Sequence, residues 1–266
     1  ATGTSAMLKR SKLPFPKGSV GETLRVHPAV IVAGEFKSPI RAWEGIPQAY
    51  ECSEFLDFEA ALKHEKSGEK GSHGKANRLW IINAFAHPMG TSTLLPGHGE
   101  DHLSLMSKYD HMAVFTAMLH DHSKGKVKPT GDLGLEIDYR LIDEDKDELR
   151  FGLKACAELL LAAGAKRAII PTNPLTEIRS SKELNKINSI SLDPNTVDLA
   201  AVHPMGSVPM GDDPETSAVG SDGRYHHAEG LWIADGSLFP TSIGVPPQLS
   251  IYSIGLHVGR KLVEFG

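Results

Sequence analysis

A histidine on a glycine-rich segment and a later Asp-Gly-Ser turn are the features of this chain that could carry chemistry. His203 opens the sequence His-Pro-Met-Gly-Ser-Val-Pro-Met-Gly, and Asp235-Gly236-Ser237 follows a short apolar run. A neutral imidazole is a suitable general base in alcohol oxidation, because the hydroxyl proton must leave as the hydride departs. Glycines let the backbone approach a ligand closely. The pattern predicts an enzyme site that moves a proton beside a cofactor.

A third segment, Pro246-Pro247-Gln248-Leu249, is expected to open the last helix of the chain. Proline fits the first turn of a helix, where its missing amide hydrogen would have no intrahelical partner. A helix start stabilises nearby negative charge by roughly 0.3–1 kcal/mol, and by more when it is partly buried. We expect this helix start to face the same cofactor as His203.

Short apolar and alternating runs predict the elements that must position these residues. The spacing of apolar residues and the turn signals give an antiparallel sheet covered by helices, in an α+β or α/β chain. Strands are expected at residues 29–34, 78–85, 113–119, 135–141 and 231–234, helices at 5–11, 143–163 and 247–265, and a polar loop at 65–76.

Charge and composition exclude several classes of protein. The 28 basic and 33 acidic residues are interspersed and give a net charge of −5, which argues against nucleic acid as a partner. No apolar run approaches the roughly 18–20 residues that a bilayer span needs, so a soluble protein is expected. Two isolated cysteines predict neither a disulfide framework nor a zinc cluster, and they leave both the cytoplasm and the periplasm open.

The histidines also have plainer interpretations. A lone His-Pro pair is typical of a capped loop residue, and the chain has two more at His27 and His87. Asp235 could simply cap the end of the strand, and Gly236 could be required only for its backbone angles. Histidines crowd residues 98–122, but their spacing matches no zinc pattern, so we predict no metal site and expect polar loop residues near the substrate entrance.

The ordered pattern resembles the C-terminal part of the glucose-methanol-choline (GMC) family of flavin oxidoreductases. The resemblance rests on residues 203–211, on Asp235-Gly236-Ser237 with Pro240, and on the Pro-rich turn at residues 244–249. The N-terminal residues 3–13 are similar to a second family signature, Gly-Thr-Pro-x-Leu-Leu-x-x-Ser-Gly-Leu, from which Ser5 and Lys12 depart. The middle of the chain matches only in general character, as a substrate domain would.

The resemblance implies the C-terminal part of a two-domain flavoprotein. Residues 1–30 and 200–266 would form part of a Rossmann-like FAD-binding domain, and residues 31–199 the substrate-binding domain. His203 would be the general base while an alcohol passes a hydride to flavin N5. FAD would be contacted by Asp235, Gly236, Pro246, Pro247, Gln248 and Leu249.

Two departures from the family pattern bear on the mechanism. Many members carry a second His or Asn where this chain has Pro246, so either His203 acts alone, or Asn83 or His87 substitutes, or simple alcohols are oxidised more slowly. The chain also lacks the Gly-x-Gly-x-x-Gly turn that holds the pyrophosphate of FAD. We therefore expect an N-terminal FAD-binding half, as a separate or cleaved chain, without which this part is inactive.

The leading hypothesis is a flavin-dependent alcohol oxidase or dehydrogenase. Pro246 leaves open a lyase or decarboxylase of the same fold, and the absent pyrophosphate turn leaves open a non-catalytic subunit that needs a partner chain. A hydrophobic alcohol is suggested by the aromatic and sulfur-containing residues of the middle region, although core packing explains them equally well. These residues are Trp43, Trp80, Phe85, Phe115 and Met118.

Overall fold

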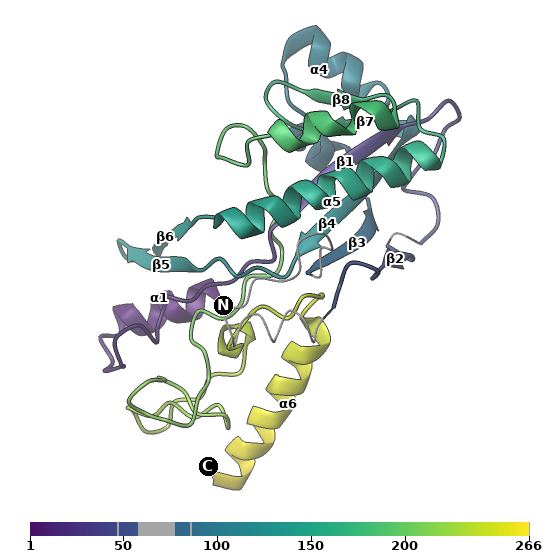
Figure 1. Cartoon of the computed structure of the whole chain (residues 1–266). Helices are drawn as coiled ribbons and strands as arrows, with labels where there is room; N and C mark the ends of the chain where they lie inside the picture. The colour runs from purple at the N-terminus through teal and green to yellow at the C-terminus, as the bar shows by residue number, and fades with distance from the viewer. Residues whose placement is uncertain (47, 58–77, 86, 266) are drawn as a thin grey trace. The chain divides into compact units, whose positions relative to one another are not determined.

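The computed structural model describes residues 1–46, 48–57, 78–85 and 87–265, and the chain forms two compact units. The first unit comprises residues 1–27, 120–145 and 201–266, and the second comprises residues 28–119 and 146–200. Each unit is built from segments that lie far apart in the sequence. Figure 1 shows the elements of both.

The unit boundaries lie close to residues 30 and 200, but residues 120–145 belong to the first unit rather than to the middle of the chain. Main-chain hydrogen bonds explain this placement. The Leu24 and Gly125 amides each donate to the carbonyl of the other, at 3.0 and 2.8 Å. The Lys9 ammonium donates to the Val127 carbonyl at 3.0 Å. The segment that follows residue 119 is thereby tied to the N-terminal segment.

The second unit is built on an antiparallel sheet, as the sequence predicted, and this sheet has six strands. Its strand order is β2-β3-β4-β1-β7-β8. The central strands are long and apolar, and their β-branched residues pack well on a pleated surface. The strands are β1 (Ala29–Glu35), β2 (Glu51–Cys52), β3 (Leu79–Ala84), β4 (Met112–Leu119), β7 (Arg167–Ile170) and β8 (Thr176–Ile178).

One face of the sheet is covered by α5 (Asp143–Ala162), which lies along the central strands in Figure 1. Its Leu149, Leu153 and Leu160 repeat at helical spacing and are fully or almost fully buried. Three acidic residues stand in the first turn, where the helix dipole favours them. The helix stops before Gly164, whose φ of +94° is a conformation that glycine adopts easily.

The opposite face of the sheet is covered by short helices. These are α3 (Pro88–Leu94), α4 (Gly99–Met106) and the single 3₁₀ turn η1 (Tyr109–His111). Leu95, Leu105 and Met112 form a buried cluster with Ala33 and Ile169 on this side. The unit also contains the 3₁₀ segment η2 (Ser181–Ser189). None of α3's residues is buried, so this cover is thin.

The first unit combines two helices, a hairpin and irregular segments. The helices are α1 (Thr2–Arg10) and α6 (Gln248–Phe265), the hairpin is β5 (Gly125–Thr130) with β6 (Gly134–Tyr139), and a 3₁₀ turn, η3, covers Gly236–Leu238. Its core joins α1, the region after residue 207 and α6. The buried members of that core are Leu8, Val20, Val208, Ala218, Val219, Tyr225, Ile233, Leu238 and Val258.

The structure confirms most of the expected elements and corrects one. Residues 231–234 do not form a strand: only an isolated bridge joins Trp232 to Arg224. Leu231 and Trp232 are half-buried and Ala234 is exposed, so this short apolar run packs on the core without a partner strand. The sequence analysis also missed β5, β7 and β8, which are short or, in β5, contain Pro129. The expected loop at 65–76 lies outside the described residues.

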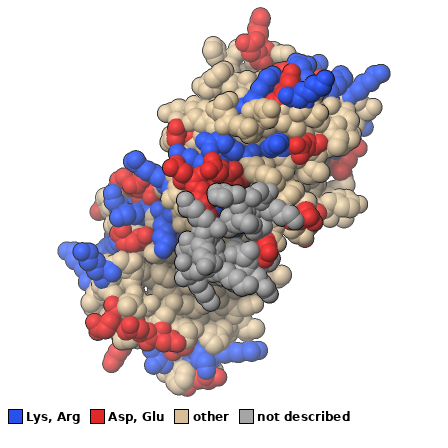
Figure 2. All heavy atoms as spheres, viewed as in Figure 1, with Lys and Arg blue, Asp and Glu red and all other residues tan. Residues whose placement is uncertain are grey.

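The surface carries charges of both signs. On the face shown in Figure 2, Lys and Arg alternate with Asp and Glu, and no extended cationic stripe is seen. Some charged side chains pair beneath the surface, such as Arg167 with the buried Glu35 at 2.6 Å. Among the described helices, none combines the length and the apolar character that a membrane span requires.

We predict that Gly152→Ala destabilises the protein, because α5 packs directly on the sheet at this residue. The new Cβ would lie 2.8 Å from the Ala117 Cβ. Overpacking of this kind costs about 1–3 kcal/mol, which exceeds the gain of up to ~1 kcal/mol from helix propensity. In the matched variant Gly90→Ala, the added methyl meets no atom within 4 Å. Thermal denaturation should show a lower midpoint for Gly152→Ala only; equal midpoints would contradict this packing.

Candidate functional site

The segment that follows His203 is held between two other segments of the first unit. On one side, Met205 and Arg25 exchange main-chain hydrogen bonds of 2.9 and 2.8 Å. On the other side, the Gly206 amide donates to the Gly236 carbonyl at 3.0 Å, and the Val208 amide donates to the Ser237 carbonyl at 2.9 Å. The two motifs singled out in the sequence therefore lie side by side.

Gly206 is required at the crossing of these segments. Its φ is +68°, in the region that favours glycine. A Cβ at this position would lie 3.1 Å from the Phe239 carbonyl oxygen and 3.3 Å from the Thr23 carbonyl oxygen. The Thr23 hydroxyl also donates to the Gly206 carbonyl at 2.7 Å. A side chain at residue 206 would therefore meet both a strained backbone angle and two nearby carbonyl oxygens.

Gly236 lies against both α6 and the residue after His203. A Cβ on Gly236 would lie 3.3 Å from Ile251 Cδ1 and 3.7 Å from the Pro204 carbonyl oxygen. Gly236 itself is buried, and Ile251 belongs to the first turns of α6. The structure thus brings the His203 segment, the Asp-Gly-Ser turn and the start of the last helix into one region.

Asp235 holds the turn together through its carboxylate. One oxygen accepts from the Ser237 amide at 2.6 Å, and the other accepts from the Thr4 hydroxyl at 2.5 Å. Burial alone would raise the pKa of Asp235, but these hydrogen bonds outweigh it and hold the pKa below its usual value. The carboxylate is still 42% exposed, so it can also meet a ligand.

His203 is half-buried, and burial lowers its pKa because the charged imidazolium is disfavoured away from water. Its ring meets the ring of His27 edge to face, with centroids 5.6 Å apart and planes at 86°. A neutral His203 is the form that can accept a proton.

His27 is the neighbour that helps to keep this region uncharged. It is 1% exposed, and its Nε2 accepts a hydrogen bond of 2.9 Å from the Gly244 amide. An accepting Nε2 carries no proton, so the ring is neutral with its hydrogen on Nδ1. Burial first, and then the nearby His203 and His120, lower the pKa of His27 to about 3. His27 also fixes the loop that leads into α6.

Asp121 ties the segments around His27 together. Its carboxylate accepts from the Val26 amide at 3.1 Å, the His27 amide at 3.3 Å and the Tyr139 hydroxyl at 2.7 Å. The Asp121 main-chain carbonyl accepts from Arg25 at 2.5 Å and from the Ser242 hydroxyl at 3.1 Å. Burial raises the pKa of Asp121, against the lowering effect of Tyr139, the Val26 amide and Arg25.

The start of α6 is open to a ligand. Pro247 is buried and its carbonyl accepts from the Ile251 amide at 2.8 Å, whereas Pro246, Gln248 and Leu249 are exposed. The first amides of a helix have no intrahelical partner and carry partial positive charge. A neutral imidazole, a close glycine backbone and an open helix start fit a cofactor that gains negative charge during the reaction.

The two residues expected to replace a second catalytic side chain lie in the second unit. Asn83 is in β3, and its Oδ1 is buried with no hydrogen-bond partner among the residues that the structure describes. His87 caps α3, where its Nδ1 accepts from the Met89 amide at 3.3 Å. Within the described parts of the chain, no group of three or more His, Cys, Asp or Glu side chains is arranged to hold a metal ion.

His27 and Asp121 are the site residues that sequence reasoning missed. The pair His27-Pro28 was noted as a second His-Pro, but its partner His203 is far away along the chain. His27 has a φ of +49°, which is a strained backbone conformation for a residue other than glycine. No signal in the sequence marks this conformation. Asp121 stands among several acidic and histidine residues that look equally exposed in the sequence.

Comparison with known proteins identifies the family. Residues 121–255, about half of the chain, match the family model described as GMC oxidoreductase. The chain belongs to the GMC oxidoreductase family. That match covers Asp121, Tyr139, His203, the Asp-Gly-Ser turn and the first turns of α6. The resemblance found in the sequence is thereby confirmed.

Several relatives extend the match over nearly the whole chain. A protein of Mycobacterium tuberculosis named as an uncharacterized GMC-type oxidoreductase is 31% identical over 99% of this chain and 38% of the relative. A long-chain-alcohol oxidase of Arabidopsis thaliana is 28% identical over 99% of this chain and 36% of the relative. The chain thus spans little more than a third of the length of these GMC relatives.

Solved structures share the fold. Pyridoxine 4-oxidase from Mesorbium loti superposes with a TM-score of 0.60 at 14% identity, over 93% of this chain and 44% of that chain. A variant formate oxidase of Aspergillus oryzae RIB40, studied for FAD modification, gives a TM-score of 0.57 at 17% identity, over 91% and 47%. The antiparallel sheet with its helices is therefore a GMC-type fold.

We predict that His27→Phe destabilises the first unit. Phenylalanine fills a similar volume but cannot accept a hydrogen bond, so the buried Gly244 amide would lose its partner. An unsatisfied buried donor costs about 1–3 kcal/mol. Chemical denaturation should show the loss, whereas the same change at the exposed His257 of α6 should leave stability nearly unchanged. Equal stability of the two variants would show that the His27–Gly244 bond is not important.

Proposed function

We propose that this GMC chain is the C-terminal part of an FAD-dependent oxidoreductase that oxidises an alcohol, with His203 as the general base. The observation that carries the proposal is that the segment following the half-buried His203 meets the Gly236 backbone, which in turn lies against the first turns of α6. FAD is supported by the family and by the formate oxidase neighbour whose FAD modification was studied. The oxidoreductase class is shared by the family as a whole.

In this proposal, each residue has a distinct part. Bound FAD would supply the acceptor for the hydride that leaves the alcohol carbon. His203 takes the hydroxyl proton on a ring nitrogen, and its lowered pKa keeps it unprotonated at neutral pH. The amides of Gln248 and Leu249 at the helix start would stabilise negative charge on the cofactor. Asp235, Gly236, Pro246 and Pro247 would complete the surface that holds it.

Pro246 stands where many members of the family carry a second His or Asn. Proline has no side-chain donor or acceptor, so at this position it cannot share the substrate hydroxyl with His203. The exposed ring of Pro246 instead bounds the helix start. His203 then acts as the base without help from a side chain at residue 246.

We infer that polypeptide outside residues 1–266 binds the pyrophosphate of FAD. Two observations support this inference. The chain spans 38% of its Mycobacterium tuberculosis relative. In addition, α6 exposes an apolar stripe with helical spacing, Leu249, Tyr252, Leu256 and Val263, at 57–85% exposure. An exposed apolar stripe of this kind is typical of a surface that a partner covers. That surface is supplied either by the same polypeptide or by an associated chain.

The first test is the effect of His203→Ala on the protein with FAD bound. Removing the base should lower turnover of alcohols by roughly 10²–10⁴, while flavin stays bound. The bound flavin of the unaltered protein should bleach anaerobically when an alcohol is added. Unchanged steady-state rates in His203→Ala would remove the proposed base, and a flavin that no alcohol bleaches would remove the proposed reaction.

The pH profile gives an independent test of the same residue. Because burial lowers the pKa of His203 below the usual 6.5, its basic form is already dominant at neutral pH. kcat/KM should rise with pH on the acid side, and the midpoint of this rise should lie below pH 6.5. The acid limb should disappear in His203→Ala. A limb that lies above pH 6.5, or one that survives in this variant, would assign the titration to another group.

A further inference from the structure

The two cysteines of the chain, Cys52 and Cys156, both lie in the second unit, and both are free thiols in the structure. Cys52 is in the edge strand β2 and is partly exposed, whereas Cys156 is in α5 and is fully buried. Their spacing in the sequence does not relate them to each other. The register of the strands and the spacing of residues along α5 do.

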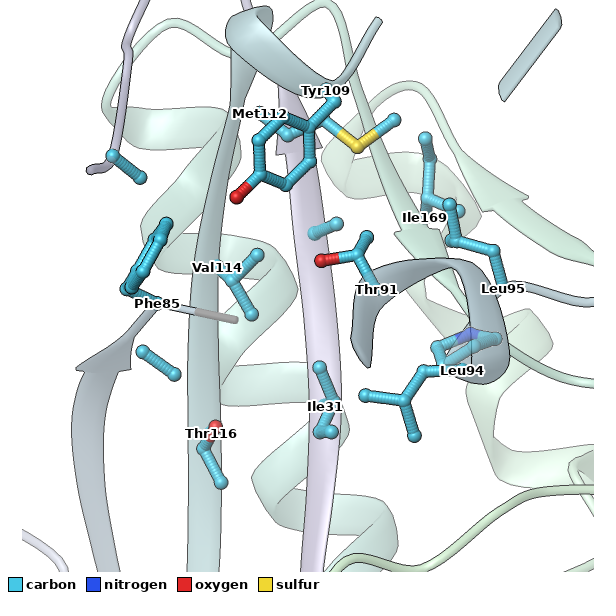
Figure 3. A pocket seen from close by; sticks show the side chains of 14 residues that line it. Ile31, Phe85, Thr91, Leu94, Leu95, Tyr109, Met112, Val114, Thr116 and Ile169 are labelled. Carbon is cyan, nitrogen blue, oxygen red and sulfur yellow. The ribbon is translucent and has the colours of Figure 1, made fainter. Parts of the chain in front are cut away.

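Cys52 stands on the face of the sheet that α5 covers. It is paired with Ile81 of β3, and Ile81 is paired with Ala117 of β4, so the three side chains share one face. That face meets α5, because a Cβ on Gly152 would lie 2.8 Å from the Ala117 Cβ. The preceding residue of β4, Thr116, stands on the opposite face, where it lines an apolar cavity of about 80 Å³ (Figure 3).

Cys156 faces the sheet from the opposite direction. It follows Gly152 by four residues, so both lie on the side of α5 that packs on the strands. The chain just after Cys52 also reaches this helix, because the rings of Phe55 and Phe151 meet edge to face with centroids 5.2 Å apart. The segment that carries Cys52 is therefore held against the part of α5 that precedes Cys156.

The environments of the two thiols give them different reactivity. Burial first, and then the charge that Cys52 would carry nearby, raise the pKa of Cys156. A buried thiol with a raised pKa stays protonated and does not start a reaction with an oxidant. Cys52 is accessible from solvent, so it is the thiol that an oxidant meets first. Cys156 is then placed to react with the oxidised Cys52.

We propose that Cys52 and Cys156 form a site of reversible oxidation, at which hydrogen peroxide joins them in a disulfide. The Cys52 thiolate attacks one peroxide oxygen, the O–O bond breaks, and the departing hydroxide takes up the proton that Cys52 released. The Cys156 sulfur then attacks the sulfur of the Cys52 sulfenic acid, the S–O bond breaks, and the Cys156 proton leaves in a second water. Two thiols and one peroxide thus give one disulfide and two waters.

The disulfide ties an edge strand to the helix that covers the sheet. β2 has two residues, and its partner in the described sheet is β3. A covalent bond between residues 52 and 156 closes a long loop, which lowers the entropy of the unfolded chain and stabilises the folded one. A thiol reductant reverses the effect. The inference is independent of the proposed function, because it uses neither His203 nor the cofactor.

The test treats the protein with FAD bound with hydrogen peroxide at low protein concentration, and then alkylates the remaining thiols. Peptide mass spectrometry without reduction should show the Cys52 peptide joined to the Cys156 peptide of the same chain, and the midpoint of thermal denaturation should rise by several degrees. Cys52→Ser and Cys156→Ser should each lose both the cross-link and the rise. In Cys156→Ser, the sulfenic acid left on Cys52 should be trapped by dimedone.

The matched control moves the second thiol to an exposed position of the same helix, by combining Cys156→Ala with Ala162→Cys. This variant should form no cross-link within the chain, although its thiol on α5 is more accessible. In the unaltered protein, two thiols that stay reduced, oxidation of Cys52 alone, or a disulfide between separate chains would overturn the proposal. An equal cross-link in the control would overturn it as well, because the pairing would then not depend on the packing of α5 on the sheet.

Discussion

The buried carboxylate of Asp121 is the constraint on which the first unit depends. A carboxylate with no exposed surface must be fully hydrogen-bonded, because desolvation of an unpaired charge is very costly. Its donors come from the segment before His27 and from Tyr139, and its carbonyl holds Arg25 and Ser242. Satisfying this one group fixes three distant segments against each other. His27, and through it the entry to α6, are placed as a consequence.

His27 links this network to the chemistry proposed for His203. The network holds the main chain of His27, and the ring of His27 in turn accepts from Gly244 and contacts His203. A charged His27 would repel a protonated His203, so a permanently neutral neighbour limits how strongly the base is perturbed. The region therefore contains one buried imidazole with a pKa of about 3 and a second, half-buried imidazole whose pKa burial lowers from its usual value.

The two faces of the sheet in the second unit are packed differently. The face against α5 is closely packed, with Gly34 under Leu160 and Gly152 against Ala117. The other face has small residues beneath a thin cover of short helices, and a cavity remains there. Because side chains alternate along β1 and β4, the residues that pack against α5 and those that border the cavity are different sets.

The sequence by itself determined the family resemblance, the antiparallel sheet, α5 and α6, because these depend on motifs and on local periodicity. It also named His203 and Asp235, whose neighbours in the chain carry the signature. Only the tertiary structure decided that His27 meets His203, that Asp121 is a buried hub and that residues 120–145 join the terminal segments. The cavity likewise depends on strand register, which pairs Ala33 and Ala84 with Val114. Contacts between residues far apart in the chain leave no periodic trace in the sequence, so folding alone brings them together.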